Sequence, residues 1–398
     1  MDKTKATILL TVFIDVIGLG VVIPILPFYV STFSSSALVL TSLFAVFSLC
    51  SFFSAPIIGA LSDKFGRRPL LILSIFSTAI GWFVFAWAPS ILFLFIGRII
   101  DGVMAGNFPI AQGFLSDIAK DDKERTANLG LIGAIFGIGF ILGPFIGGAL
   151  GKIGHTVPFW FVGLLALLNG IMAYFILPET HHELSNKKIS INPFRPLYNA
   201  VKNTPLRLNF LAWFFFGLAI SSYQSIFSLF MRDTYHFDEF AVGLVFGVTG
   251  VIIALNQGVA MKHIWLKYFK EPTLELGMLI IFAIGFFMLS LKIFTLFWIA
   301  ILLTTFGQSI LRVVMTSQVV GKSDRSERGE ILGIMSSITS LSMMIGPFLA
   351  GILYGFSKSY PFVLGGLCLI LAFVVLYQKR KELRNTALPE DVVMESLV

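Results

Sequence analysis

The sequence predicts an all-α integral membrane protein with twelve transmembrane helices in two six-helix halves. Hydrophobic residues make up 56% of the 398 residues and charged residues only 13%, whereas soluble domains carry about 25% charged residues. The apolar residues form twelve runs long enough to cross a bilayer, and the second half of the chain repeats part of the first. A soluble fold cannot hide so much apolar surface, so we expect lipid as the solvent.

The twelve apolar runs are separated by short polar stretches. The alternating pattern of barrel strands does not occur in the sequence, so each run is predicted to be a helix. The first run is too long for a signal-peptide core and lacks a small-residue cleavage site, so it is expected to stay in the protein. The predicted spans are residues 6–30, 38–60, 69–88, 90–115, 127–150, 157–177, 206–231, 239–261, 273–291, 293–318, 330–355 and 360–378.

The basic residues between these spans predict the orientation. The two ends and the connections on their side hold 23 Lys and Arg, and the connections on the opposite side hold four. Basic residues stay on the cytoplasmic side, so both termini are predicted to be cytoplasmic in a plasma or inner membrane. The net charge of +7 is spread over short loops; this favours contact with anionic lipid over nucleic acid. The predicted units are residues 1–178 and 206–378 as six-helix bundles, 179–205 as a cytoplasmic linker and 379–398 as a tail.

An internal repeat supports the division into halves. Residues 124–150 align with residues 327–353 at a constant offset of 203, with ten of 27 positions identical. The identities include Gly143 with Gly346 and Gly148 with Gly351. A duplication of this kind predicts two bundles related by a pseudo-two-fold axis along the membrane normal, with a substrate path between them.

Three ionisable residues in the first half lie inside predicted spans. Asp15 lies in the first span, and Arg98 and Asp101 lie one helical turn apart in the fourth. Such groups are costly in lipid and are functional candidates by default. A purely structural ion pair between Arg98 and Asp101 is one alternative. The other is that Asp15 and Asp101 share Arg98 as a counter-ion and that one acid carries a proton, since burial favours a protonated carboxylate and a guanidinium favours a charged one.

Polar residues in other spans are candidates for a substrate cavity. Arg312 has no acidic partner within its own half, so it either reaches an acid of the first half or offers a positive site to a substrate anion. Uncharged polar residues are costly in lipid but useful along a wet cavity, although hydrogen bonds between helices are the usual alternative. These candidates are Gln112, Tyr223, Gln224, Asn256, Gln257 and Gln308.

The fifth span is rich in glycine and contains a proline. Gly139, Gly143 and Gly147 recur every four residues, and Gly148 follows directly. Small residues at this spacing let helices approach closely, and Pro144 removes a backbone donor and permits a bend. We expect this helix to form a close contact that is either static packing or part of the conformational change.

Four motifs together resemble the major facilitator superfamily and its twelve-helix drug:proton antiporter branch. GALSDKFGRRP (59–69) is similar to the signature of the connection between helices 2 and 3. The stretch around Arg98, the GPFIGG run (143–148) and Asp15 with its two downstream prolines resemble motifs of helices 4, 5 and 1. The resemblance covers nearly the whole chain. Within the branch the chain looks most like tetracycline-efflux proteins, but the stretches 77–87, 251–258 and 277–287 lack the acids and the histidine of those pumps. Tetracycline is therefore not the expected substrate.

The resemblance implies a gating cluster on the cytoplasmic side. Asp63 and Arg67 belong to it, and Asp117 is the implied partner of Arg67. Asp63 would face the start of helix 11 near Gly329 when the protein opens outward, because a helix N-terminus attracts an anion. Glycines at 59 and 66 are expected to permit the turn and a close approach, and Arg68 contributes to the cytoplasmic charge.

The resulting prediction is a proton-coupled secondary transporter that exports small organic, drug-like molecules by alternating access. The alternative within transport is a proton symporter or facilitator for a sugar or another metabolite, and a receptor or scaffold is a different class. No P-loop or hydrolytic constellation occurs, so an enzyme is not expected. The two cysteines, Cys50 and Cys368, lie far apart in apolar runs. We therefore expect no disulfide, metal or cofactor, and a monomer whose partners are substrate, protons and lipid.

Overall fold

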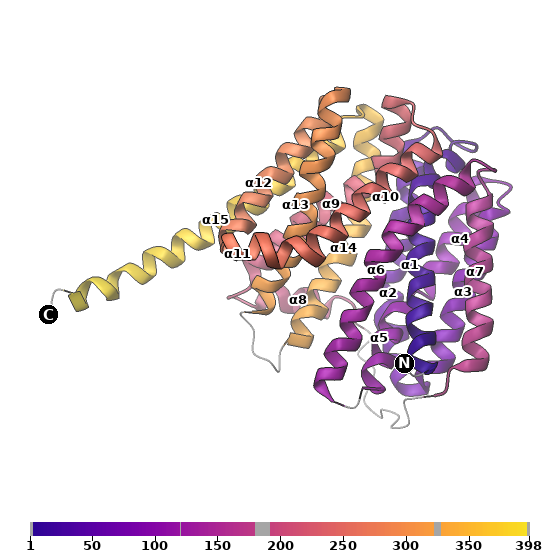
Figure 1. Ribbon diagram of the computed structural model, residues 1–398, viewed down its shortest axis with the longest axis horizontal. Helices are drawn as coiled ribbons and strands as arrows, with labels where there is room; N and C mark the ends of the chain where they lie inside the picture. The colour runs from indigo at the N-terminus through magenta and orange to yellow at the C-terminus, as the bar shows by residue number, and fades with distance from the viewer. Residues whose placement is uncertain (1–2, 120, 180–191, 322–327, 396–398) are drawn as a thin grey trace.

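A computed structural model describes residues 3–119, 121–179, 192–321 and 328–395, and every regular element in these residues is a helix. Figure 1 shows the helices of the first half and those of the second half as two neighbouring groups. The first group comprises α1 (Lys3–Val30), α2 (Ala37–Phe65), α3 (Arg67–Ala86), α4 (Ile91–Val103), α5 (Asn107–Asp117), α6 (Asp122–Gly151) and α7 (Val157–Ile176). The second comprises α9 (Arg207–Tyr235), α10 (Glu239–Leu255), η1 (Asn256–Trp265), α11 (Leu266–Tyr268), α12 (Glu271–Ser290), α13 (Phe294–Val320), α14 (Arg328–Phe356) and α15 (Tyr360–Glu395).

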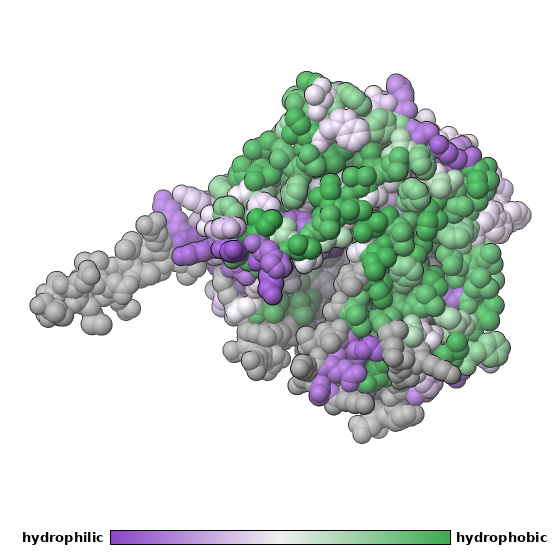
Figure 2. All heavy atoms as spheres, in the orientation of Figure 1, coloured by the Kyte–Doolittle hydropathy of each residue, from purple (hydrophilic) through white to green (hydrophobic). Residues whose placement is uncertain are grey.

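The described helices agree with the predicted membrane spans. Eleven are long and apolar enough to cross a bilayer, and α6 adds a shorter apolar segment at Ile135–Gly151. Large apolar side chains cover the outside of the bundle, as the green surface in Figure 2 shows. Two features were not predicted: α8 (Arg195–Lys202) lies within the linker, and α15 continues without a break through most of the predicted tail, projecting from the bundle in Figure 1.

The fourth span is broken in its middle, where a continuous helix was predicted. Residues 104–106 separate α4 from α5. The break lies one turn before Pro109, whose ring cannot donate a backbone hydrogen bond and clashes with the preceding turn. Ser74 of α3 stabilises the break, because its hydroxyl donates to the carbonyl of Met104 and accepts from the backbone N–H of Gly106 at 3.0 Å.

The eighth span changes its winding halfway. It begins as α10 and continues as a ten-residue π-helical segment, η1, before the short α11. Trp265 Nε1 donates to Asn256 Oδ1 at 2.6 Å, which joins the two ends of η1. π-helical segments are frequent at functional sites, and η1 lies beside a cavity described below.

The repeat in the sequence has a counterpart in the packing. In the first half Gly143 of α6 meets Gly20 of α1, with so little space that an added Cβ would lie 2.7 Å from the Gly20 Cα. In the second half Gly346 of α14 meets the backbone of Ser222 in α9, where an added Cβ would lie 3.1 Å from the Ser222 nitrogen. The two equivalent glycines therefore serve the same helix contact in each half.

The two groups of helices meet closely at the face opposite the chain termini. Gly148 at the end of α6 lies against Gly243 near the start of α10, and its repeat equivalent Gly351 lies against Thr41 of α2. Arg232 Nη1 of α9 donates to the Pro27 carbonyl of α1 at 2.6 Å. These contacts close that face, and Figure 2 shows the molecule hollowed near its centre between the two groups.

Candidate functional site

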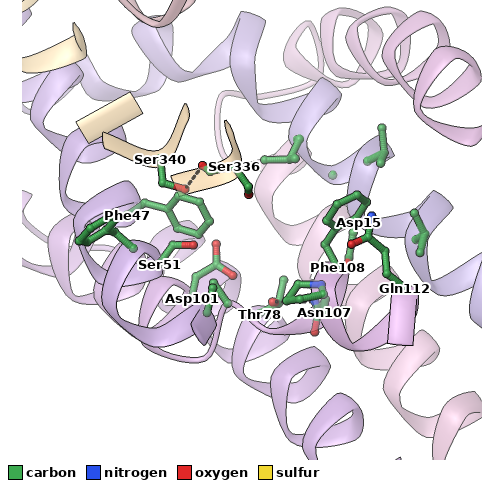
Figure 3. Close-up of a pocket in the computed structure, with 18 of the residues that line it drawn as sticks. Asp15, Phe47, Ser51, Thr78, Asp101, Asn107, Phe108, Gln112, Ser336 and Ser340 are labelled. Carbon is green, nitrogen blue, oxygen red and sulfur yellow. Dashed lines mark hydrogen bonds between the residues drawn. The ribbon is translucent and has the colours of Figure 1, made fainter. Parts of the chain in front are cut away.

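A cavity of about 480 Å³ contains both acids predicted inside the first half. Asp15 of α1 and Asp101 of α4 line it together with polar residues of α2, α3 and α5. Ser336 and Ser340 of α14 form the opposite wall, where Ser340 Oγ donates to the Ser336 carbonyl at 3.2 Å (Figure 3). The acids therefore lie where the two halves face each other.

Arg98 pairs with one of the two acids. Its Nη1 lies 3.4 Å from Asp101 Oδ2, and the side chain is only 3% exposed. The guanidinium also lies over the rings of Trp82 and Phe47, at 4.6 and 5.1 Å from their centroids. These contacts hold α4 against α3 and α2. Cation–π contacts of this kind contribute roughly 0.5–2 kcal/mol each.

The shared counter-ion predicted for the acids is wrong in this conformation. No ion pair joins Asp15 to Arg98 in the described part of the chain, and Asn107 lies between Asp15 and Asp101 in the cavity lining (Figure 3). The reason is the orientation of Arg98, whose guanidinium lies over Phe47 of α2 and Trp82 of α3 and beside Asp101. The contact of the fourth span with α1 is made by α5.

A row of polar side chains lies between the two acids. Asn107 Nδ2 donates to Thr78 Oγ1 at 3.4 Å, and both residues line the cavity together with Asp15 and Asp101. Figure 3 shows Thr78 and Asn107 between the two acids. Neither residue was predicted; the available signal for Asn107 was an amide in a membrane span two residues before Pro109.

A second cavity, of about 580 Å³, adjoins the first. Gln112, Phe108 and Phe136 line both. Five predicted cavity residues of the second half also line it: Tyr223, Gln224, Gln257, Gln308 and Arg312. No Asp or Glu is among its described lining residues, so Arg312 is the charged group of this cavity.

Asn256 differs from the prediction that it lines a substrate cavity. It is 2% exposed and is absent from the described linings of both cavities. Its Nδ2 donates to Ser309 Oγ at 2.5 Å, and its Oδ1 accepts from Trp265. Asn256 therefore stabilises η1 against α13, which is the usual role of an interhelical amide.

The glycines of α6 serve two different neighbours. Gly139, Gly143 and Gly147 face α1, where an added Cβ on each would come within 3.0 Å of α1 atoms. Gly148 faces α10 of the other half, and the Pro144 carbonyl lies against Gly243 of the same helix. The first three positions therefore join helices within one half, and the end of the motif joins the two halves.

Residues 59–69, which form the end of α2 and the turn into α3 and are called the charged turn below, bring three predicted residues together. Arg67 Nη1 lies 3.0 Å from Asp63 Oδ1, and Arg67 Nε pairs with Asp117 Oδ2 at the end of α5. Arg67 also lies so close to Gly113 that an added Cβ would overlap its guanidinium. The expected approach of Asp63 to the start of α14 stays a prediction, because it concerns the outward-facing conformation, whereas this structure is closed at the face opposite the termini.

Glu179 completes this turn and was not predicted. Its two carboxylate oxygens accept from the backbone N–H groups of Arg67 and Arg68, each at 3.1 Å. An anion at a helix N-terminus stabilises the helix. Gly66 has φ of +98°, and an added Cβ there would overlap Glu179. Arg68 Nη2 donates to the Tyr174 carbonyl at 2.7 Å, which fixes α3 to α7.

Gly59 does not have the role that the sequence suggested. It lies inside α2, one turn before Asp63, and the turn itself is made by Gly66 alone. A Cβ added at Gly59 would meet no described atom within 4 Å. Neither the turn nor a close approach requires glycine at this position in the observed conformation.

Comparison with known proteins agrees with this architecture. The sequence matches the profile of the Major Facilitator Superfamily over residues 8–291 and again over residues 265–392. This chain belongs to the major facilitator superfamily. It is a multi-pass membrane protein of a family of transporters, and the predicted superfamily is confirmed.

Individual relatives resemble the chain over most of its length. It is 29% identical over 370 residues to the tetracycline resistance protein, class C, of Escherichia coli, covering 90% of this chain and 91% of that protein. It is 26% identical to multidrug resistance protein 2 of Bacillus subtilis (strain 168), with 96% of each chain covered. Among solved structures, the nucleoside transporter NupG has a TM-score of 0.76 at 12% identity, covering 95% of this chain and 99% of that one, and shares the fold.

Proposed function

We propose that the protein is a proton-coupled secondary transporter that exports small organic, drug-like molecules from the cytoplasm by alternating access. The observation that carries the proposal is the pair of acids, Asp15 and Asp101, in a cavity between two halves that are closed at one face. The similarity to tetracycline and multidrug resistance proteins supports export as the direction. The count of basic residues supports cytoplasmic termini, and the cavity then opens toward the cytoplasm.

In this proposal the two acids take up and release protons, and the transport cycle moves the substrate across the membrane in the direction opposite to the protons. Protonation of Asp101 weakens its attraction for Arg98, whose side chain joins α4 to α2 and α3. Protonation of Asp15 removes a negative charge from the cavity that Asn107 at the start of α5 also lines. Both protonation events act on helices that border the cavity. The protonation states of Asp15 and Asp101 therefore shift the equilibrium between the conformations closed at one face and at the other.

The charged turn acts as the cytoplasmic gate in this proposal. Arg67 holds Asp63 and Asp117 in the observed conformation. When the cytoplasmic face closes, Asp63 approaches the N-terminus of α14, an attraction of roughly 0.3–1 kcal/mol when exposed and about 2 kcal/mol when partly buried. Because residues 59–69 have a basic counterpart at residues 262–272 that has no acid at the position of Asp63, this gate belongs to one half only. The protein works as a monomer in this proposal, since residues of a single chain line both cavities.

Reconstitution into proteoliposomes tests this function. Full-length protein is given an inward proton gradient, and a panel of dyes and drugs that includes tetracycline is screened for uphill movement against the proton flux. We expect antiport of amphipathic compounds other than tetracycline. Movement of a compound together with protons would overturn export and favour a symporter. Transport that ignores the gradient would favour a facilitator, and the absence of any transport would contradict the proposal.

A further inference from the structure

We propose that Arg312 is the binding site for a substrate carboxylate and that the preferred substrates are aromatic carboxylates. The inference rests on the proposed function and specifies the substrate class. Arg312 lies on α13, and its side chain is exposed to the second cavity. Arginine inside a membrane costs roughly 2.5–3.5 kcal/mol unless it is paired or faces water, and such residues mark substrate paths.

Arg312 differs from the other arginines near the membrane in its partners. Arg98 pairs with Asp101, Arg232 with Asp233 and Arg380 with Glu275. No carboxylate of the described residues lies within 4 Å of the Arg312 guanidinium, so the predicted alternative of a partner acid in the first half is not realised in this conformation. A cavity that presents an arginine without a protein anion is suited to an anion from outside.

The neighbours of Arg312 fit a carboxylate and its carbon body. Gln308 lies one turn before Arg312 on the same helix face, and Gln224 and Tyr223 line the same cavity from α9. Amide and hydroxyl groups donate hydrogen bonds to carboxylate oxygens, and a guanidinium binds both oxygens at once. The rings of Phe136 and Phe140 of α6 also line this cavity and suit an aromatic body.

The two cavities differ in the charge of their lining residues, so the proton sites and the proposed substrate site are different places. Asp15 and Asp101 line the first cavity and Arg312 lines the second, and Gln112 lines both. A cationic amphiphile in the second cavity meets a like charge, whereas a carboxylate meets an opposite one. The volume of about 580 Å³ lies within the range of drug-sized pockets.

Binding of a matched set of ligands tests this site. The probes are 2-naphthylacetate, the neutral 2-naphthylacetamide and 2-(2-naphthyl)ethylammonium, measured by calorimetry on the full-length protein in detergent without a proton gradient. We expect the carboxylate to bind roughly tenfold or more tightly than the amide, because charge-assisted hydrogen bonds are about twice as strong as neutral ones. The ammonium is expected to bind most weakly. Equal binding of carboxylate and amide would overturn the proposal, and so would tightest binding of the ammonium.

Variants separate a binding role from a structural one. Arg312→Gln is expected to abolish the carboxylate-to-amide ratio, and Arg312→Lys is expected to restore part of it. Lys267→Gln removes the same charge from an exposed position and is expected to keep the wild-type ratio. An unchanged ratio in Arg312→Gln, or an equal loss in Lys267→Gln, contradicts the inference. Because the binding experiment uses no proton gradient, a negative result contradicts only the carboxylate site and not proton-driven export. Conversely, the ligand preference can still be measured if the transport experiment shows no export.

Discussion

The contact between Gly148 of α6 and Gly243 of α10 is expected to control which face of the protein is closed. An added Cβ at Gly148 would lie 2.9 Å from the Glu239 carbonyl oxygen and 3.2 Å from the Gly243 Cα. These are backbone atoms, so Gly148→Ala forces the two helices apart. Overpacking of this kind costs roughly 1–3 kcal/mol. Since α6 stays helical in either conformation, the cost falls on the observed state and lowers its population about 5- to 150-fold relative to the opposite state.

Distances between spin labels measure this shift. Ile153 and Ile293 are exposed at the face opposite the termini, one in each half, and accept labels as cysteines once Cys50 and Cys368 are replaced by alanine. We expect the Gly148→Ala variant to gain a longer distance between the labels. Gly351→Ala, at the equivalent position of α14, is expected to act in the same direction.

Gly355→Ala is the matched control, because it lies one turn further along α14 and an added Cβ meets no described atom within 4 Å. Its distance distribution is expected to match that of the parent. If Gly148→Ala lowers transport while the distances stay unchanged, the glycine contact is static packing and the reasoning is refuted.

Three other changes test the gate and the row of polar groups. Arg67→Ala removes the guanidinium that joins the charged turn to Asp117; we expect normal membrane amounts but at least tenfold slower transport, and normal transport at matched amounts would reduce the motif to a determinant of topology. Gly66→Ala is expected to lower the unfolding temperature, because its φ of 98° with ψ of 149° is a conformation that costs a residue other than glycine roughly 1–3 kcal/mol and the Cβ overlaps Glu179; an unchanged melting curve contradicts this. Asn107→Leu is expected to lower gradient-driven transport about tenfold while exchange without a gradient persists, because it removes the hydrogen bond to Thr78 between the two acids and an unsatisfied buried polar group costs roughly 1–3 kcal/mol; equal losses in both assays would indicate a packing defect.

The membrane spans were predictable from the sequence because each depends on an average over about 20 residues. Such an average is insensitive to single residues, so the predicted ends mostly fall within a few residues of the observed ones. The repeat was predictable for a related reason, since Gly143 and Gly346 keep the same contact in both halves. The break before α5 was not predicted, although Pro109 was a local signal for it.

The pairing of polar side chains was less predictable. Arg98 and Asp101 share one helix, so their contact follows from a spacing of three residues. The neighbours of Asp15 depend on how α1 and α5 are rotated and on where α4 ends, which no local pattern specifies. Asn256 shows the same limit, because an amide in a span can face a cavity or a neighbouring helix, and here Ser309 and Trp265 satisfy it.

The measurement that tests the central claim most directly compares the wild type with Asp15→Asn in proteoliposomes. An imposed proton gradient drives uphill transport in one assay, and exchange of labelled for unlabelled substrate without a gradient is followed in the other. If Asp15 carries the proton, Asp15→Asn abolishes uphill transport and retains exchange. Full gradient-driven transport by Asp15→Asn would contradict this account and would move the proton to Asp101.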